Sequence, residues 1–462
     1  MKKYLLSLLT VLLFICVVSS DNIYDNSNTY IKFELENADL VNLKKVKCNE
    51  CSGSNLVTDF QRHNGKSILK LNINNPDFYN VKLNYRIPNN SDKKKVQLKV
   101  NNSKGIELTL ANNGDNTFKD SVSKLIYLNK GLNTIIISSS WGYLDLDYIT
   151  ISNVTKLNYN LVNKNSNSET RRLMSFLLDN YGKKIIAGQQ NIDYVDWIYE
   201  KTGKKPAIIG FDFMDYSPSR VENGNYSNEV DKAIEWSKNG GIVTFSWHWN
   251  APKDLSNWKR GFYTDGTHFN LDYALRHTDS EDYKLLLRDI DQIAIQLKKL
   301  ENNNVPVIFR PLHEAEGGWF WWGAKGPEAA KKLYITLYKR ITNYHQLNNI
   351  IWVWNSISPD WYPGDNYVDI VSYNSFPSNY NYSSVIEKFD LLNDLVNNKK
   401  LVSISENGSI PDPIYLNNDQ ANWSWFLTWD SFIKSKNTID HIKYIYNNDY
   451  VLTLDEIPKD KN

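Results

Sequence analysis

Two glutamates in the second half of the chain have the type and setting that cleavage of a glycosidic bond would require. Glu314 closes the segment RPLHE at 310–314, and Glu406 closes the segment LVSISE at 401–406. Two carboxyl groups about 5–5.5 Å apart suit retaining hydrolysis, because one attacks the anomeric carbon while the other protonates the leaving oxygen and then activates water. Burial and a neighbouring charge keep the acid protonated, whereas hydrogen bonds keep the nucleophile ionised.

Both glutamates lie in a region where short apolar runs alternate with helical stretches. The runs cover residues 185–187, 207–211, 242–247, 305–309, 350–354, 368–373, 401–404 and 426–429. This alternation predicts an α/β fold, a parallel (β/α)8 TIM barrel, whose strand ends line one mouth. We therefore expect Glu314 and Glu406 to meet there. Without this context, either glutamate would more often be a surface residue or a salt-bridge partner.

The first half of the chain has a different pattern of apolar residues. From 30 to 152, apolar residues alternate with period two in short runs separated by Asn, Gly, Ser and Pro, which is typical of an all-β sandwich or jelly roll. A polar stretch rich in Asn and Ser follows. We therefore expect a β-sandwich over 25–155, a linker over 156–168 and the barrel over 169–457.

The balance of charge argues against a nucleic-acid partner. The 462 residues include 53 Lys and Arg and 52 Asp and Glu, so the formal net charge is +1. Aromatic residues make up 13% of the chain, with 15 Trp and 29 Tyr. Flat rings with polar tips suit stacking on sugars, although ordinary core packing explains most of them.

The start of the chain is typical of an export signal. Two lysines precede an apolar run at 5–18, and small residues precede Asp21, so residues 1–20 are predicted to be removed. No other apolar stretch approaches twenty residues, and we expect a secreted monomer that does not bind a membrane. Outside the reducing cytosol, Cys48 and Cys51 are predicted to form a local disulfide, because their flanks read as a loop rather than a redox motif.

The sequence EAEGGWFWWG at 314–323 resembles the acid/base segment of glycoside hydrolase family 26, most of whose members are β-mannanases. Other similar segments are IAGQQ at 186–190, SWHW at 246–249, WYPGD at 361–365 and SENG at 405–408. The resemblance covers about 165–454. It implies a (β/α)8 barrel with retaining chemistry and no cofactor for catalysis.

The resemblance also implies roles for individual residues. Glu314 is expected to be the acid/base and Glu406 the nucleophile. His313 would order the acid and contact the sugar next to the scissile bond, and Arg310 would bind substrate. Glu316 is a weaker candidate for the acid, because it lies two residues beyond the predicted strand end.

Three further residues are expected to contact sugar. By the same resemblance, His248 would line the glycone side, Trp319 would stack near the cleavage point, and Trp429 would lie beneath the reacting sugar. Each aromatic residue has a packing alternative, and Trp321 and Trp322 in particular could be loop core.

One segment departs from the family pattern. Members commonly end the sixth strand with Asp-x-Tyr, and the Tyr hydroxyl bonds the nucleophile. This chain has Asn374, Ser375 and Phe376 instead, and a phenyl ring cannot donate that bond. Tyr373 or Tyr380 could substitute, although Tyr373 would point to the opposite face of the strand from Asn374. Losing such a bond typically costs a few kcal/mol, so a weakened enzyme or an altered substrate is an open alternative.

The first half resembles carbohydrate-binding module family 35 over about 30–153. Its matching ends are FELENA at 33–38 and LDLDYI at 144–149. The resemblance implies that Glu34, Glu36 and Asp147 hold a structural calcium, with Glu34 and Glu36 on one face of a strand. A solvated acidic face is the alternative. Trp141 would stack on sugar, with a buried core position as its alternative.

Our leading hypothesis is a secreted, retaining endo-β-1,4-mannanase with an appended binding module, acting on mannan, glucomannan or galactomannan. Related barrels that cut β-1,3-xylan or mixed-linkage β-glucan remain alternatives, as does a sugar-binding protein with weakened catalysis. A metal-dependent hydrolase is suggested by His248 and His313. It is disfavoured because Gln189 and Gln190 stand at the first strand, where metal barrels usually carry paired histidines.

Overall fold

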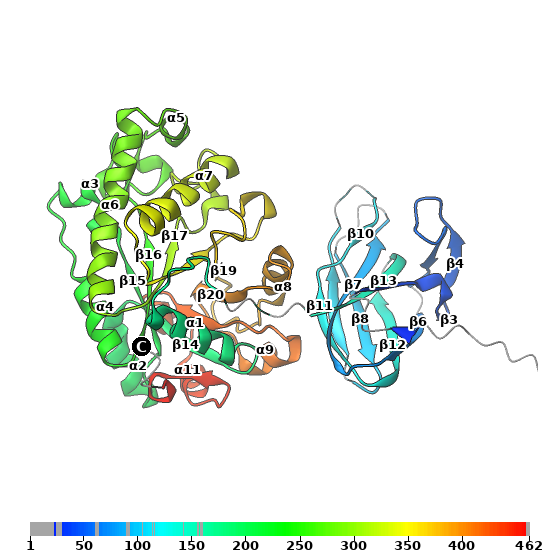
Figure 1. Cartoon of the computed structure of the whole chain (residues 1–462). Helices are drawn as coiled ribbons and strands as arrows, with labels where there is room; N and C mark the ends of the chain where they lie inside the picture. Colours follow the sequence, from blue (N-terminus) through cyan, green and yellow to red (C-terminus); the bar gives the residue numbers. More distant parts are fainter. Residues whose placement is uncertain are drawn as a thin grey trace, which may run out of the picture. The chain divides into compact units, whose positions relative to one another are not determined.

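The structure is a computed structural model of the chain (Figure 1). It describes residues 23–24, 30–60, 64–88, 93–103, 105–112, 114, 116–141, 143–154, 157 and 160–458. Contacts between residues divide the chain into two compact units, with the boundary after Val154. The predicted export signal over 1–20 lies outside the described residues, and so does the side chain of Trp141.

The first unit contains two mainly antiparallel β-sheets. One sheet consists of β1 (Ile23–Tyr24), β3 (Asp39–Val41), β6 (Lys66–Ile73), β8 (Lys94–Val100), β9 (Ile106–Leu110) and β12 (Gly131–Trp141). The other consists of β2 (Tyr30–Glu34), β4 (Lys44–Lys47), β5 (Asn55–Thr58), β7 (Asp77–Arg86), β10 (Lys119–Asp120), β11 (Lys124–Leu128) and β13 (Asp145–Asn153). Apolar residues of both sheets share one core, so the unit is the expected β-sandwich.

The period of two in the sequence is visible in the burial of these strands. Residues of β8 alternate between buried and exposed, and Val96, Leu98 and Val100 point into the core. A short hairpin joins β4 to β5, and a disulfide between Cys48 and Cys51 closes its loop, with the two Cα atoms 5.4 Å apart. The prediction of a local disulfide is confirmed.

The second unit is built on a closed parallel barrel. Its strands are β14 (Ile185–Gln190), β15 (Ile208–Asp212), β16 (Ile242–Trp247), β17 (Val307–Pro311), β18 (Ile350–Trp354), β19 (Ile370–Ser375), β20 (Leu401–Asn407) and β21 (Trp425–Thr428). Neighbours in this order pair with one another, and β14 pairs with both β15 and β21, which closes the ring. The predicted fold class is confirmed, since each predicted apolar run forms one barrel strand.

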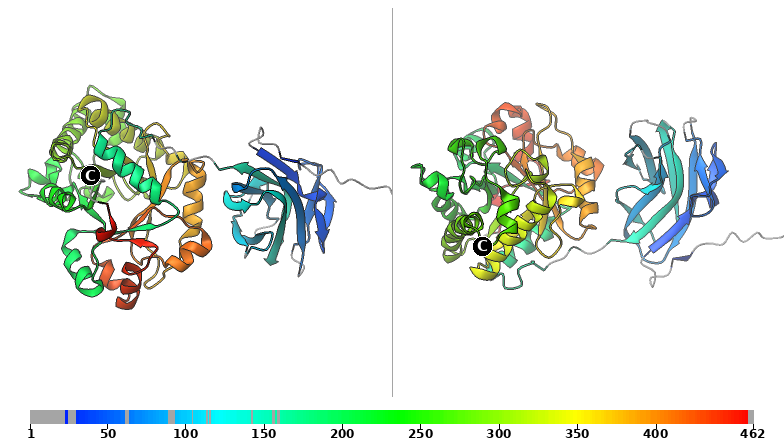
Figure 2. Two further views of the ribbon diagram at one scale, coloured as in Figure 1. Left: turned by 60° about the horizontal axis from the view of Figure 1, so that its bottom comes forward. Right: turned by 90° about the horizontal axis from the view of Figure 1, so that it is seen from above.

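Helices surround the strands, as Figure 2 shows. They are α1 (Ser168–Asn180), α2 (Val195–Thr202), α3 (Pro218–Val221), α4 (Glu229–Lys238), α5 (Leu271–Arg276), α6 (Glu281–Asn302), α7 (Pro327–Tyr338), α8 (Ile386–Leu395), α9 (Pro413–Asp419), α10 (Phe432–Ser435) and α11 (Ile439–Tyr446). Side-chain caps fix several of their starts. The Asn167 side chain accepts from the Thr170 backbone N–H at the start of α1, and the Ser280 side chain accepts from that of Tyr283 at the start of α6. No helix of the described residues is both long and apolar enough to cross a membrane.

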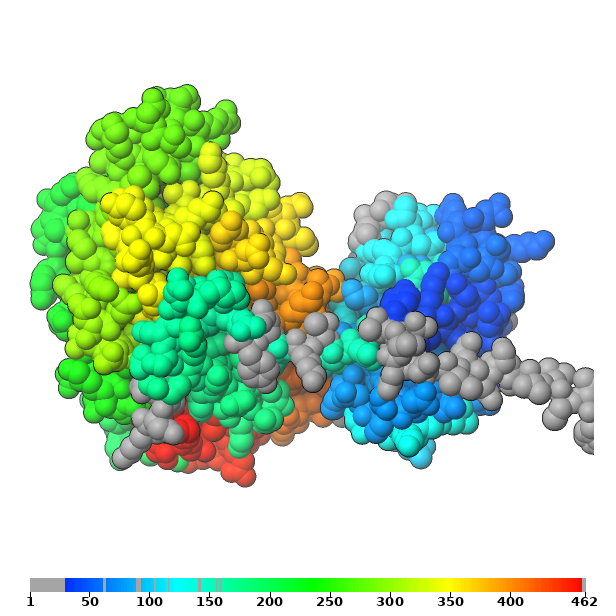
Figure 3. All heavy atoms as spheres, in the orientation of Figure 1, coloured from blue at the N-terminus to red at the C-terminus, as the bar shows by residue number. Residues whose placement is uncertain are grey.

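The segments before and after the barrel are tied to it. Leu161 is buried in the apolar layer between the strands and α1, and the Val162 backbone N–H donates to Asp369 at 2.7 Å. At the other end, β22 (Val451–Leu452) pairs with β14. The red end of the chain therefore lies beside the blue-green segment that begins the barrel unit (Figure 3).

Candidate active site

Glu314 is held by a tight turn directly after β17. Leu312 and Glu314 both have left-handed backbone conformations, with φ of 52° and 53°, which residues other than glycine adopt at an energetic cost. The Glu314 backbone N–H donates to both the carbonyl and the side-chain oxygen of Asn355, each at 3.1 Å. Asn355 follows β18, so the neighbouring strand fixes the turn.

Two donors orient the Glu314 carboxylate. Asn374 Nδ2 donates to Oε1 at 2.7 Å, and Trp319 Nε1 donates to Oε2 at 3.0 Å. The Trp319 side chain is 48% exposed, so much of its ring is open to solvent. The arrangement places an aromatic platform beside a carboxyl group that can exchange a proton with a bound sugar.

Glu406 lies deeper, at the end of β20. Its carboxylate accepts a hydrogen bond from the guanidinium of Arg310, which comes from β17, and both side chains are buried. Burial raises the pKa of Glu406 above its usual value, and the nearby Glu314 carboxylate adds to this, while Arg310 and His248 oppose it. The barrel thus brings the two glutamates close enough to interact electrostatically.

Two histidines extend this buried network. His248 Nδ1 is 2.5 Å from Asp212 Oδ2, and His248 Nε2 is 3.2 Å from His313 Nε2. Burial lowers the pKa of His248, but Asp212 and Glu406 outweigh it and raise that pKa overall. The pKa of His313 is held well below its usual range by burial and by the charges on His248 and Arg310. These shifts favour the charged form of His248 and the neutral form of His313, and a charged His248 can donate to both Asp212 and His313.

Aromatic rings enclose His248. The rings of Phe262, Phe320 and Trp429 lie 5.2, 5.7 and 6.0 Å from it, centroid to centroid. Trp429 follows β21, and its backbone N–H donates to the Asn407 carbonyl at 2.8 Å. This bond holds the Trp429 backbone at the end of the strand, and the residue is half-buried there.

Two cavities meet the network from different sides. His248 and Trp429 line a cavity of about 500 Å³, and Glu314 and Trp319 line another of about 490 Å³. A third cavity, of about 450 Å³, shares Lys388 with the second. Glu314 and His248 therefore each border a hollow large enough for a sugar unit, whereas Glu406 lines none of these three cavities.

The nearby candidates Glu316, Trp321 and Trp322 have other partners. The Glu316 carboxylate accepts backbone N–H groups of Ile357 and Ser358 at 2.8 to 3.2 Å, so it anchors the loop after β18. Trp321 and Trp322 are buried, and Trp322 Nε1 donates to the His313 carbonyl at 3.0 Å. Both tryptophans form the loop core, as the packing alternative predicted.

The departure at 374–376 has a clear structural outcome. Phe376 is 47% exposed and packs edge-on against Phe432. Among the hydrogen bonds of the described residues, Glu406 accepts from Arg310, and no tyrosine hydroxyl reaches it. Asn374 instead supports the other glutamate, Glu314, which an ionised aspartate could not do because it has no donor.

Tyr373 and Asn374 are consecutive residues of β19, and both border the same cavity. The pairing of β19 with β20 shifts at this point, because Tyr373 pairs with Ile404 whereas Asn374 pairs with Glu406. The extra residue, Ser405, lies on β20, so the bulge does not interrupt the alternation of faces along β19. The opposite orientation of Tyr373 stays a prediction.

Several contributors were not assigned from the sequence. Asp212, which orients His248, carried only the signal that it closes the second predicted strand. Asn355 carried the same signal after the fifth strand. Phe262 comes from the long segment after β16, which folds into short 3-10 turns and α5 and has no periodicity that sequence reasoning could use.

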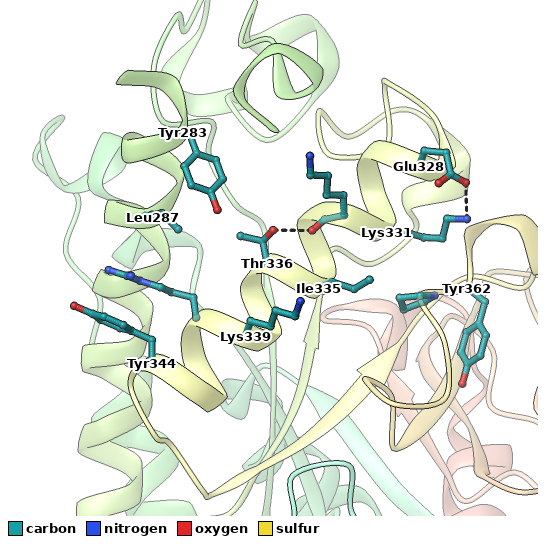
Figure 4. A pocket seen from close by; sticks show the side chains of 12 residues that line it. Tyr283, Leu287, Glu328, Lys331, Ile335, Thr336, Lys339, Tyr344 and Tyr362 are labelled. Atoms are coloured by element: carbon teal, nitrogen blue, oxygen red, sulfur yellow. Dashed lines mark hydrogen bonds and ion pairs between the residues drawn. The ribbon is translucent and has the colours of Figure 1, made fainter. Parts of the chain in front are cut away.

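A further cavity, of about 820 Å³, lies on the outside of the barrel (Figure 4). Tyr283 and Leu287 of α6 face Thr336 of α7 and the adjoining Lys339 across it. Neither glutamate of the candidate site lines this cavity, which marks it as separate from the chemistry described above.

In the first unit, three carboxylates converge. Each of Glu34, Glu36 and Asp147 offers an oxygen within 4.8 Å of those of the others. Glu34 and Glu36 do not share a strand face, contrary to expectation. Strand β2 ends at Glu34, and Glu36 lies in the 3-10 turn η1 (Leu35–Asn37). Among the described residues, this is the only such cluster of three His, Cys, Asp or Glu side chains, so His248 and His313 do not belong to one.

The closed barrel, with glutamates at the ends of its fourth and seventh strands beside aromatic hollows, defines a glycoside hydrolase. The chain belongs to glycosyl hydrolase family 26, whose model matches residues 162–456. Residues 31–154 match carbohydrate binding module family 35.

Named relatives span most of the chain. A mannan endo-1,4-beta-mannosidase of Thermothelomyces thermophilus is 43% identical over 88% of this chain and 86% of its own length. Mannan endo-1,4-beta-mannosidase B of a Piromyces species is 32% identical over 93% of this chain and 77% of its own. The crystal structure of a Podospora anserina β-(1,4)-mannanase with the same two family domains is 41% identical and covers 94% of this chain and 100% of its own, with a TM-score of 0.65.

Proposed function

We propose that this protein is a secreted, retaining endo-β-1,4-mannanase that hydrolyses mannan-type polysaccharides through a covalent glycosyl-enzyme intermediate. The observation that carries the proposal is that Glu314 lies close enough to Glu406 for its charge to act on the pKa of Glu406. Each of the two carboxylates also has its own hydrogen-bond donor. The names of the relatives support the substrate class.

In the first step, Glu406 attacks the anomeric carbon of the bound sugar. The bond to the leaving oxygen breaks as that oxygen takes the proton from the Glu314 carboxyl group. The charge of Arg310 and any positive charge on His248 favour the ionised form of Glu406 against the cost of its burial. The result is an ester between Glu406 and the sugar, with Glu314 left ionised.

In the second step, Glu314 takes a proton from water, and the hydroxyl attacks the anomeric carbon of the ester. The bond between Glu406 and the sugar breaks, and the anomeric configuration is restored by this second inversion. Trp319 Nε1 and Asn374 Nδ2 donate to the two oxygens of Glu314 and hold its carboxylate in place for this step.

The presence of more than one cavity supports binding of a chain that continues past the cleavage point. His248 and Trp429 line one cavity, Trp319 lines a second, and Lys388 lines both the second and a third. Sugar units on both sides of the reacting bond are what attack within a polymer requires. Release of oligosaccharides of several lengths from mannan would agree with this, whereas release of only one short product would contradict it.

The proposal is tested with the purified protein on mannan, glucomannan, galactomannan, β-1,3-xylan and mixed-linkage β-glucan. We expect reducing sugar from the mannans, and a fall of about 10⁴-fold or more in turnover for Glu406→Gln, because the nucleophile is lost. NMR of the first product should find the anomeric configuration of the substrate. Turnover only on xylan or glucan would show that mannan is not the substrate class. A first product with inverted anomeric configuration would exclude the covalent intermediate.

A sugar-binding protein with weakened catalysis is the second candidate. It is favoured by Phe376, which offers no hydroxyl to Glu406. In that case Glu406→Gln would leave the protein's behaviour unchanged, because turnover would already be negligible. The same turnover measurement therefore distinguishes the two functions.

We also propose that the first unit binds a structural calcium at Glu34, Glu36 and Asp147. Glu36 and Asp147 are buried, and Glu36 Oε2 and Asp147 Oδ1 have no hydrogen-bond partner. Burial and the neighbouring Glu34 carboxylate raise the pKa of both side chains. A hard divalent cation with oxygen ligands would satisfy these atoms. Calorimetric titration of the EDTA-stripped protein with Ca²⁺ tests the site.

Secretion and the monomeric state are likewise proposals. The sequence of residues 1–20 supports export, and the mature protein should begin near Asp21. N-terminal sequencing of protein from the culture medium and light scattering of the purified protein check both. A retained N-terminus or a dimeric mass would contradict them.

A further inference from the structure

The loop between β4 and β5 lies directly over the carboxylate cluster of the first unit. The loop comprises residues 48–54, and the disulfide closes its first half. Two backbone hydrogen bonds complete it, from the Cys48 N–H to the Ser54 carbonyl at 3.0 Å and from the Ser54 N–H to the Cys51 carbonyl at 3.3 Å. Cys48 and Cys51 are both buried, so the disulfide belongs to the packed part of the loop.

Ser52, the residue after the disulfide, contacts two members of the cluster. Its backbone N–H donates to Asp147 Oδ2 at 3.0 Å. Its hydroxyl lies 2.5 and 2.6 Å from the two carboxylate oxygens of Glu34. One residue of the loop thus bridges carboxylates from β13 and β2, and it leaves Asp147 Oδ1 without a hydrogen bond.

Gly53, the next residue, contacts the third member. A Cβ atom at this position would lie 2.0 Å from Glu36 Oε1, so the Glu36 carboxylate occupies the space that any other side chain would take. Lys32 Nζ lies 3.2 Å from Glu34 Oε1, and the positive charge of Lys45 also reaches Glu36. These lysines offset only part of the negative charge, and Glu36 Oε2 and Asp147 Oδ1 still have no partner.

We propose that the disulfide between Cys48 and Cys51 is the positioning element of this cation site. It holds Ser52 and Gly53 against the three carboxylates, so that the ligand oxygens are ordered before the cation arrives. The inference rests on the proposed calcium site. Without the disulfide, the loop gains conformational freedom, and binding the cation must also order the loop.

The coupling must run in both directions. If the disulfide strengthens Ca²⁺ binding, bound Ca²⁺ must stabilise the disulfide by the same factor. A dithiol reductant such as dithiothreitol breaks the S–S bond with two electrons and two protons, giving two cysteine thiols and a cyclic disulfide of the reagent. The position of this reduction equilibrium in the wild-type protein is a second measure of the coupling between Ca²⁺ and the disulfide, and it needs no substitution.

The experiment is a calorimetric titration of the EDTA-stripped full chain with Ca²⁺. We expect Cys48→Ser/Cys51→Ser to bind Ca²⁺ about tenfold or more weakly than the wild type. Asn49→Ala is the matched control, because this exposed residue lies inside the same loop and its substitution keeps the disulfide. Its affinity should equal that of the wild type. In the wild type, saturating Ca²⁺ should shift the dithiothreitol concentration needed for half-reduction upward.

The outcomes separate the two proposals. Wild-type protein that binds no Ca²⁺ would overturn the calcium site, and the inference with it. Wild-type protein that binds Ca²⁺ with the same affinity as the double-serine variant would overturn the inference alone. If that variant fails to fold, reduction of the wild type decides, and a half-reduction point unchanged by Ca²⁺ would refute the coupling.

Discussion

Arg310 is the residue on which the ionisation of Glu406 most depends. Both side chains are buried, and burial raises the pKa of the carboxyl group while the guanidinium lowers it. A nucleophile reacts only when it is ionised, so activity falls as the pH drops through this pKa. Because the pKa is raised, the loss on the acidic side begins at a higher pH than for an exposed glutamate.

Replacing Arg310 should therefore raise the pH at which activity is lost on the acidic side. We expect Arg310→Gln to shift the acidic limb of the profile of kcat/KM against pH upward, because an opposing positive charge is lost. Arg310→Lys retains a charge and should shift the limb less. An acidic limb that does not move in Arg310→Gln would show that another group controls it.

The two glutamates of the sequence EAE should behave differently when replaced by glutamine. Glu316→Gln removes a carboxylate that accepts hydrogen bonds from two backbone N–H groups, so we expect a loss of about 1–3 kcal/mol in the free energy of unfolding. Its turnover should fall by less than about tenfold, whereas Glu314→Gln should lose about 10²–10⁴-fold on unactivated substrates. Denaturant unfolding and steady-state kinetics measure both. The reverse pattern would make Glu316 the acid.

At the scale of elements, the strands could be predicted from the sequence. The detailed geometry of the site could be predicted only in part. Apolar runs such as 242–247 mark buried parallel strands directly, because both faces of such strands are covered. The position of Glu314 also followed from a strand end. Its left-handed turn and its bond to Asn374 depend on strands far apart in the sequence, which no local pattern encodes.

The same limit applies to the first unit. The sequence brought Glu34, Glu36 and Asp147 together only through a resemblance, and the expected shared strand face was wrong for Glu36. The bridging role of Ser52 depends on a hairpin loop folding back over β13, a contact 95 residues away in the sequence.

The burial of Asn407 at the end of β20 leads to a prediction about N-glycosylation. Asn407 begins the sequence NGS, which is an acceptor for N-glycosylation. Its side chain is fully buried, and Nδ2 donates to the Ser409 carbonyl at 3.3 Å and Thr428 Oγ1 at 3.2 Å. We expect peptide mass spectrometry of active protein from a glycosylating host to find Asn407 unmodified. Full occupancy in active enzyme would contradict this burial.

At the scale of the whole molecule, the two units should respond separately to calcium. EDTA should lower the melting temperature of the first unit, because a ligand that binds only the folded state stabilises it. The barrel contains neither the carboxylate cluster nor the loop 48–54, so kcat on short soluble manno-oligosaccharides should not change. Scanning calorimetry and kinetics with and without EDTA test this. A loss of turnover that parallels the melting shift would contradict it.

The pairing of β14 with β21 and β22 constrains the order in which a ribosome can complete this protein. All strands of the first unit are synthesised by Asn153, so that unit has every partner it needs early in translation. Strand β14 can pair with β15 soon after it is made, but its pairing with β21 and β22 must wait for residues encoded more than two hundred positions later. Until then the edge of β14 that will face β21 is an unpaired apolar strand edge, which is prone to pair with other chains.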